Sequence, residues 1–174
     1  MVSVHGGGLK VPILVWALAA AFLLLVASLL IGAFSKPDFP PYELGAHPDG
    51  TYTLDASSGD QWAWWREIGF RRNHVITPIG AGALDLGPVA FDSVRQVPAN
   101  GYVATTFSSD TTNDAIGKWY DYSMWSHLLT SRHHVYAIRT PAGEFAKLEI
   151  IAYYCRQVGA ACYTVRYETA RPRV

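Results

Sequence analysis

The stretch from Val11 to Phe34 constrains this chain more than any other feature, because it contains no charged residue. As an α-helix it would extend roughly 36 Å, enough to cross a bilayer core of about 30 Å. A cleaved signal peptide is the alternative, with Ile31-Gly32-Ala33 as its cleavage site. Such a peptide normally has an apolar core of only about 7 to 15 residues. The longer run favours an uncleaved transmembrane helix over residues 11–34.

The flanking charges set the expected orientation. Lys10 and the amino terminus precede the apolar run, whereas Lys36 after it is offset by Asp38. The positive-inside rule therefore predicts a cytoplasmic segment at residues 1–10. We expect a single-pass protein of the bacterial inner (cytoplasmic) membrane, with its C-terminal part in the periplasm.

A proline-rich stretch follows the apolar run. Four prolines lie between Ser35 and Pro48, and proline denies the backbone helix and ladder hydrogen bonds. Residues 35–49 are therefore predicted to be a stiff linker, and residues 50–174 a single periplasmic domain.

Composition indicates that this domain is built from strands. Aromatic residues make up 13% of the chain, with six Trp and ten Tyr, and such side chains favour pleated sheets. Lys and Arg together number 14, as do Asp and Glu, so no net charge favours nucleic acid as a partner. We predict a mainly β, antiparallel domain preceded by one transmembrane helix.

The last third of the chain shows the clearest strand pattern. Ala146, Leu148 and Ile150 alternate with Lys147 and Glu149, which predicts a strand with one buried and one polar face. Together with its neighbours this run predicts a β-meander of three strands: Val135–Thr140, Phe145–Tyr154 and Tyr163–Glu168.

Earlier runs are also rich in aromatic and β-branched residues. They predict strands in Thr51–Leu54, Trp62–Thr77 and Tyr102–Phe107. The glycine-rich stretch Ile79–Ala83 is expected to be a flexible loop.

Two cysteines flank a turn-like segment between strand runs. A bridge between Cys155 and Cys162 would close a hairpin and indicate an oxidising compartment. Two unpaired thiols are the alternative interpretation. Two cysteines without other ligands do not form a zinc site, so no metal is expected.

Two segments carry a resemblance to a known family: WWREIGFRRNHVITPIGAGALDLGPVAFDSV (Trp64–Val94) and GKWYDYSMWSHLLTSRHHVYAIRTPAGEFAKLEIIAYYC (Gly117–Cys155). In order and spacing these resemble the HmuY-like family of extracytoplasmic haem-binding proteins. The resemblance implies a mainly antiparallel β fold that holds a porphyrin between side chains from loops and strand ends. It assigns no iron ligand to a position in this sequence.

Iron-ligand candidates come from residue chemistry, because imidazole and thioether groups are the usual neutral axial ligands of haem. His133 and His134 are adjacent, so on a strand they would point to opposite faces, and at most one could reach a shared site. Placement in an ordinary polar loop or surface is the alternative for all of them. The candidates are Met124, His127, His133, His134 and His74.

Aromatic and basic side chains suggest a docking surface. Trp62 and Trp64 share one face of a regular strand, while Trp65 points the other way. One side is expected to be core and the other a patch for a partner or for lipid headgroups. The partner-binding candidates are Trp62, Trp64, Trp65, Arg71, Arg72 and Trp125.

Catalytic motifs do not occur: there is no P-loop, HExxH, GxGxxG or CxxCH. We therefore expect a non-catalytic accessory subunit without a cofactor, whose partners are the bilayer and other subunits of an integral membrane complex, such as an energy-transducing or photosynthetic one. The alternative is a membrane-tethered protein that binds b-type haem. A periplasmic carbohydrate or peptide binder is a third interpretation.

Overall fold

The computed structural model describes residues 12–173, which form two compact units. The first contains the N-terminal helix up to Lys36 together with Ser123–His127, and the second contains the remainder of the chain from Pro37 onward. The expected cytoplasmic segment at residues 1–10 lies outside the described residues.

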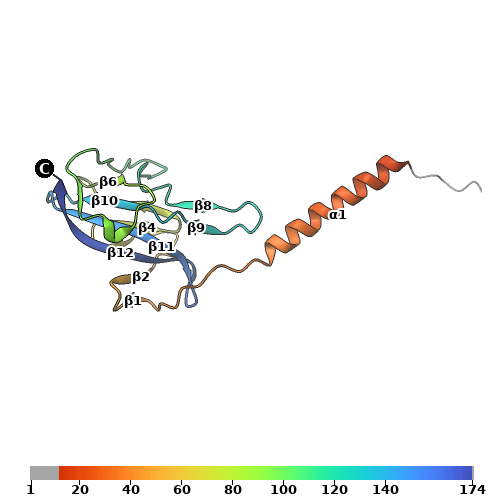
Figure 1. The fold of residues 1–174 in the computed structure, drawn as a ribbon, viewed down its shortest axis with the longest axis horizontal. Coiled ribbons are helices and arrows are strands. Elements are labelled where there is room, and N and C mark those ends of the chain that lie inside the picture. Colours follow the sequence, from red (N-terminus) through yellow and green to blue (C-terminus); the bar gives the residue numbers. More distant parts are fainter. Residues whose placement is uncertain (1–11, 174) are drawn as a thin grey trace, which may run out of the picture. The chain divides into compact units, whose positions relative to one another are not determined.

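The first unit is dominated by α1 (Ile13–Ala33), shown in Figure 1. Pro12 precedes the helix, where its missing N–H costs no intrahelical hydrogen bond. Among the described residues of α1, only Gly32 is buried. A helix that is apolar on every side is typical of a lipid environment, and α1 is long and apolar enough to cross a membrane.

A large sheet forms the centre of the second unit (Figure 1). Neighbouring strands on its main path are antiparallel, and the C-terminal meander predicted from the sequence is confirmed. Its order is β1 (Gly45–Ala46), β2 (Thr51–Asp55), β12 (Gly159–Arg173), β11 (Phe145–Cys155), β10 (Val135–Arg139) and β6 (Gly82–Asp85), with β7 (Gln96–Pro98) parallel to β12. Strand β1 lies within residues 35–49, the stretch expected to be a stiff linker.

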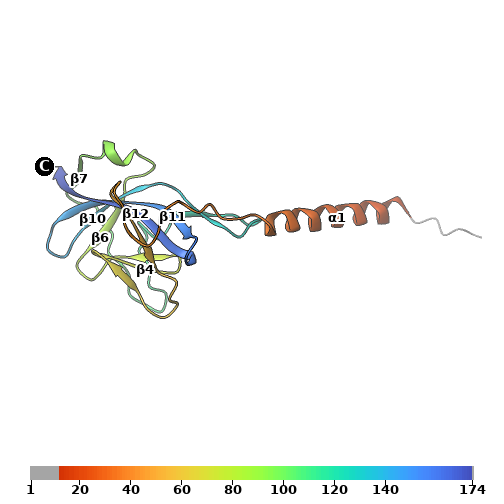
Figure 2. The ribbon, with the colours of Figure 1, turned by 90° about the horizontal axis from the view of Figure 1, so that it is seen from below.

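Two smaller sheets complete the second unit. The run Trp62–Thr77 is a three-stranded sheet made of β3 (Ala63–Trp65), β4 (Ile68–Arg71) and β5 (His74–Ile76). A separate hairpin pairs β8 (Tyr120–Tyr122) with β9 (Leu129–Ser131). In Figure 2, β4 lies on one side of the large sheet and the green turn of η1 (Phe91–Ser93) on the other.

Two expectations about the middle of the chain were wrong. Gly82 and Ala83 belong to β6 rather than to a loop, and Gly82 is needed because a Cβ there would lie 2.9 Å from the Cβ of Tyr102. The run Tyr102–Phe107 makes only isolated bridges. There the Thr105 hydroxyl accepts a hydrogen bond from the Thr77 backbone N–H, so a side chain replaces a ladder contact.

An aromatic core lies between the large sheet and the β3–β5 sheet. The Trp119 ring lies 5.3 Å from Tyr163 and 5.5 Å from Tyr153, and Phe70 lies 4.7 Å from Tyr163, measured between ring centroids. The Trp119 indole N–H donates to the Asn73 carbonyl. Trp119 and Tyr163 therefore bury large apolar areas while the indole N–H and the Tyr163 hydroxyl each donate to a backbone carbonyl.

The paired cysteines close the β11–β12 hairpin. Cys155 and Cys162 form a disulfide with a Cα–Cα distance of 5.6 Å, as predicted. Register shifts in β11 follow Ile150 and Ala152, and they place Tyr153 in the core in place of Tyr154. Simple alternation therefore fails beyond Ile150, because the bulge between Ile150 and Ala152 shifts the inward-facing position of β11 by one residue.

Candidate functional site

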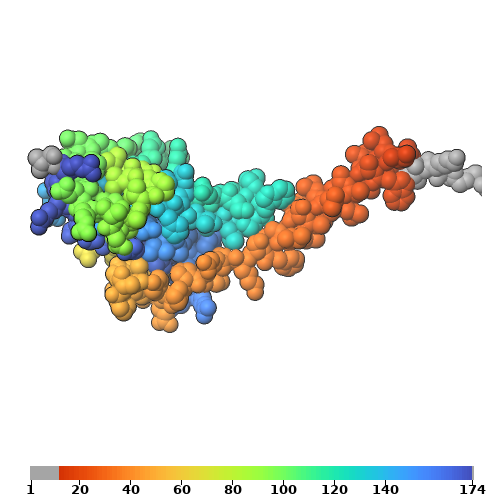
Figure 3. Space-filling view, viewed as in Figure 1, coloured from red at the N-terminus to blue at the C-terminus, as the bar shows by residue number. Residues whose placement is uncertain are grey.

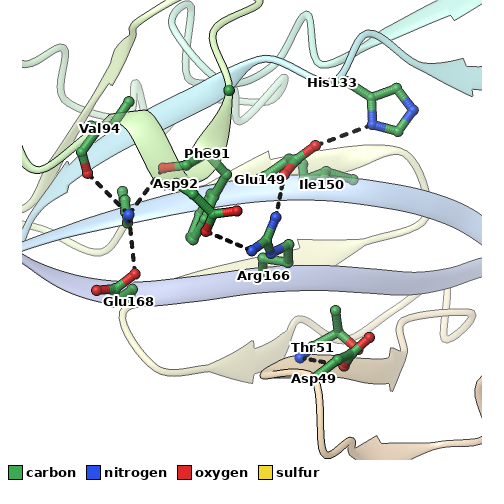
Figure 4. A network of polar contacts seen from close by, with 12 residues as sticks. Asp49, Thr51, Phe91, Asp92, Val94, His133, Glu149, Ile150, Arg166 and Glu168 are labelled. Carbon is green, nitrogen blue, oxygen red and sulfur yellow. Dashed lines mark hydrogen bonds and ion pairs between the residues drawn. The ribbon is translucent and has the colours of Figure 1, made fainter.

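A buried lysine joins η1 to the outer face of the large sheet, which is the face opposite the β3–β5 sheet. The Lys147 ammonium lies 3.0 Å from the carbonyl oxygens of Phe91 and Val94 and 3.0 Å from the Glu168 carboxylate. Figure 4 shows these three oxygens converging on one nitrogen. The alternation predicts that Lys147 lies on the polar face of its strand, and the structure buries it there, since it is only 4% exposed. Burial is possible because all three ammonium protons find acceptors.

A chain of ion pairs continues along this face (Figure 4). Arg166 on β12 contacts Asp92 of η1 at 2.9 Å and Glu149 of β11 at 3.9 Å, and Glu149 contacts the His133 imidazole at 3.2 Å. The Arg166 guanidinium also lies 4.4 Å from the Phe91 ring centroid. These contacts hold η1 at a fixed place on the sheet.

A groove of about 860 Å³ opens beside this polar network. Figure 3 shows its neighbourhood, where the dark blue end of β12 meets the green segment that contains η1 and β7. Its lining combines cationic and apolar side chains, among them Arg95, Arg171, Arg173, Leu86, Val89 and Val94.

The adjacent histidines His133 and His134 point to different acidic partners. His133 Nδ1 lies 3.2 Å from Glu149, and His134 Nδ1 lies 2.9 Å from Asp85. Their contacts lead to β11 and β6 respectively, on either side of β10. The structure therefore does not bring these two imidazoles to one site, and no group of three potential metal ligands occurs among the described residues.

The segment Ser123–His127 carries two of the candidate iron ligands. Met124 is 70% exposed, and His127 has a positive φ of 57°. The Ser123 carbonyl accepts the His127 backbone N–H, and the Ser123 hydroxyl accepts that of Ser126. This tight turn presents a thioether and an imidazole within four positions of each other.

His74 on β5 lines a separate small cleft of about 190 Å³. Asn73, Lys118 and Tyr120 also line it, and the Asn73 amide donates to the Tyr120 hydroxyl at 2.9 Å. The cleft is smaller than the roughly 300–1,000 Å³ typical of ligand sites, so it is too small to enclose a porphyrin.

The tryptophan-rich strand divides as its alternation predicts. Trp65 stacks on Tyr52 and contacts Tyr167 at the edge of the core. Trp64 is half exposed on the other side, close to Trp62, whose ring lies 4.5 Å from the Arg71 guanidinium.

Arg72 and Trp125 are the remaining docking candidates. Arg72 occupies the β4–β5 turn, where its carbonyl accepts the Tyr163 hydroxyl. Trp125 belongs to the Ser123–His127 segment. Trp62, Trp64 and Arg71 therefore form one Trp and Arg patch, in which Trp64 is half exposed.

Sequence reasoning missed the arginines of the groove. Arg95 precedes β7, whereas Arg171 and Arg173 end β12, and only the β7–β12 pairing brings them together. The Arg-Pro-Arg run at residues 171–173 was the one available signal.

Neither a protein-family model nor a curated protein matches the sequence. Solved structures do match. A Bacteroides vulgatus protein described as HmuY-like and haem-binding is 17% identical, with a TM-score of 0.58 over 72% of this chain and 97% of its own.

Two further matches share the same architecture. An apo HmuY analogue of Tannerella forsythia is 16% identical, with a TM-score of 0.52 over 67% of this chain and 71% of its own. A Bacteroides fragilis protein described as a lipoprotein is 14% identical, with a TM-score of 0.58 over 71% of this chain and 95% of its own. The chain therefore has the HmuY-like fold that its sequence resemblance predicted.

Proposed function

We propose that this chain is a membrane-anchored extracytoplasmic protein whose β domain binds haem. The observation that carries the proposal is the HmuY-like fold, shared along nearly the whole length of a protein described as haem-binding. The disulfide supports an oxidising compartment, and the apolar helix α1 supports a membrane anchor. An anchored haem binder would capture or buffer haem beside its own bilayer.

The Ser123–His127 segment is the best source of an axial ligand. It offers the imidazole of His127 and the thioether of Met124, and both groups suit haem iron. This turn would supply one ligand to the iron. His133 and His134 contact different carboxylates, so the fold does not bring these two imidazoles to one site. Bound haem would contribute its iron and porphyrin, and this turn would orient them.

Titration of the purified full-length chain with hemin tests the proposal. We expect a Soret band at stoichiometric hemin, and about tenfold or greater weakening of hemin affinity in the double variant Met124→Ala/His127→Ala. The matched control is His133→Ala/His134→Ala, which removes two imidazoles outside the turn and should retain the band. Absence of any Soret change in the unaltered chain would refute haem binding.

Membership of a membrane complex is a second candidate function. Two observations favour it: α1 exposes apolar side chains on every side, and Trp62, Trp64 and Arg71 form an exposed patch on the domain. Purification in mild detergent should then recover stoichiometric partner subunits, which Trp64→Ala/Arg71→Ala would release. Recovery of the monomer alone would count against this candidate.

A further inference from the structure

We propose that the groove between the η1–β7 segment and the end of β12 binds a phosphorylated ligand that also has an apolar part. This groove shares no lining residue with the Ser123–His127 turn, and the inference does not depend on haem binding. The groove is lined by three arginines and by the apolar side chains of Leu86, Val89 and Val94.

The charge of the groove is uncompensated. Within residues 12–173, no carboxylate lies within ion-pair distance of Arg95, Arg171 or Arg173. Glu168 is the acidic residue of the lining, and its carboxylate already contacts the Lys147 ammonium at 3.0 Å. The groove therefore presents three positive charges to whatever occupies it.

Neighbouring cations on the same face differ sharply from these three. Arg166 contacts both Asp92 and Glu149, and Lys147 has three oxygen partners. Since the fold neutralises the cations that hold η1, the unpaired arginines are not required for that structural task. They are available for an anion from outside the chain.

Strand pairing brings the backbone positions of the three arginines to one groove, which all three line. Arg171 and Arg173 are two positions apart on β12, so they share a side of the strand with a spacing of about 7 Å. The parallel ladder pairs Arg171 with Gln96 of β7, which places Arg95 next to that pair. Guanidinium forks bind phosphate oxygens in a bidentate manner, and several forks can grip one or two phosphate groups.

The wall of the groove is already in place without a ligand. The buried Lys147 bonds the carbonyls of Phe91 and Val94, and Val94 itself lines the groove. A preformed wall reduces the ordering cost of binding. The volume of about 860 Å³ lies within the range of small-molecule sites.

Charge matching favours phosphate over a single carboxylate. A phosphate monoester carries about −1.5 to −2 at neutral pH, so one or two such groups balance three guanidinium groups. Leu86, Val89 and Val94 would contact the apolar part of the ligand. Free phosphate compounds and lipid headgroups share this chemistry, and two probes distinguish these sources.

The test titrates the full-length chain in a non-ionic detergent with inorganic pyrophosphate and, separately, with dihexanoyl phosphatidic acid. We expect Arg171→Ala/Arg173→Ala to weaken binding by on the order of a hundredfold, because two charge-assisted contacts are lost. Arg139→Ala/Arg156→Ala is the matched control, since it removes two exposed arginines that do not line the groove. Unchanged thermal unfolding of both variants verifies folding.

Each outcome decides the proposal. Binding of pyrophosphate that only the groove variant loses supports a soluble phosphate compound, and the same result with phosphatidic acid alone supports a lipid headgroup. Failure of both probes to bind, or equal loss in both variants, would overturn the site. Citrate binding as tightly as the phosphate probes would overturn the phosphate class, because citrate carries only carboxylates.

Discussion

The two faces of the large sheet are covered by different physical means. On the inner face Trp119, Phe70 and Tyr163 form an apolar core in which aromatic rings contact one another. On the outer face η1 is held by the buried ammonium of Lys147 and by the Arg166 ion pairs. Because side chains alternate along β11, Leu148 lies on the inner face and Lys147 on the outer face.

This difference teaches where stability and binding chemistry reside. The inner cover removes apolar surface from water, which is the dominant favourable contribution to folding. The outer cover depends on directional contacts that are costly to leave unmade. It also leaves Arg95, Arg171 and Arg173 beside a groove, so the ligand groove that we propose lies on the polar face.

Removing Trp119 from the inner face should cause the largest loss of stability. We expect Trp119→Ala to lower the free energy of unfolding by about 3–5 kcal/mol, because a fully buried ring leaves a cavity among Tyr153 and Tyr163. Chemical denaturation measures the change. Trp64→Ala removes a half-exposed ring and should cost less than about 1 kcal/mol; equal losses would show that burial does not rank these positions.

Replacing the buried lysine should have a smaller but clear effect. We expect Lys147→Met to lower the free energy of unfolding by about 2 kcal/mol, because the carbonyls of Phe91 and Val94 lose their donor. The control is Asp92→Asn, an exposed pair with Arg166 that should cost less than about 1 kcal/mol. A Lys147→Met protein as stable as the original would mean that the ammonium contacts add no net stability to the packing of η1.

Alkaline pH should destabilise the aromatic core on the inner face. Burial raises the pKa of Tyr153 from 10.0 to about 12, so the folded protein keeps the phenol neutral where the unfolded chain ionises it. This stabilisation is complete below pH 10 and is lost as the pH rises toward 12. Unfolding free energies measured from pH 9 to pH 12 should therefore decline, and less steeply in Tyr153→Phe. An identical decline in both proteins would assign the loss to other groups.

Elements with a local signal were predictable. The apolar run gave α1, the alternation from Ala146 to Ile150 gave β11, and the two cysteines gave the disulfide. Strand β6 was missed because Gly82 and Ala83 have low strand propensity, and they are paired only because β10 lies beside them.

The candidate ligand residues also divide into those with a local sequence signal and those placed by distant segments. The prediction that His133 and His134 diverge assumes a strand, but both lie between β9 and β10, and His133 has a positive φ of 51°. They still contact different carboxylates, Glu149 and Asp85. The cleft that contains His74 had no local signal. It forms from β5 and from residues about forty positions later in the chain.

By itself the sequence determined an apolar helix, an antiparallel meander and a closed disulfide hairpin, because periodicity and residue chemistry act over a few neighbouring positions. Only the tertiary structure decided that Lys147 is buried and that Arg95 lies beside Arg171 and Arg173. Both depend on segments that are distant in the chain. Phe91 and Val94, at η1, supply carbonyl acceptors that compensate the burial of the ammonium. Strand β7 pairs with the end of β12 and so brings Arg95 to it.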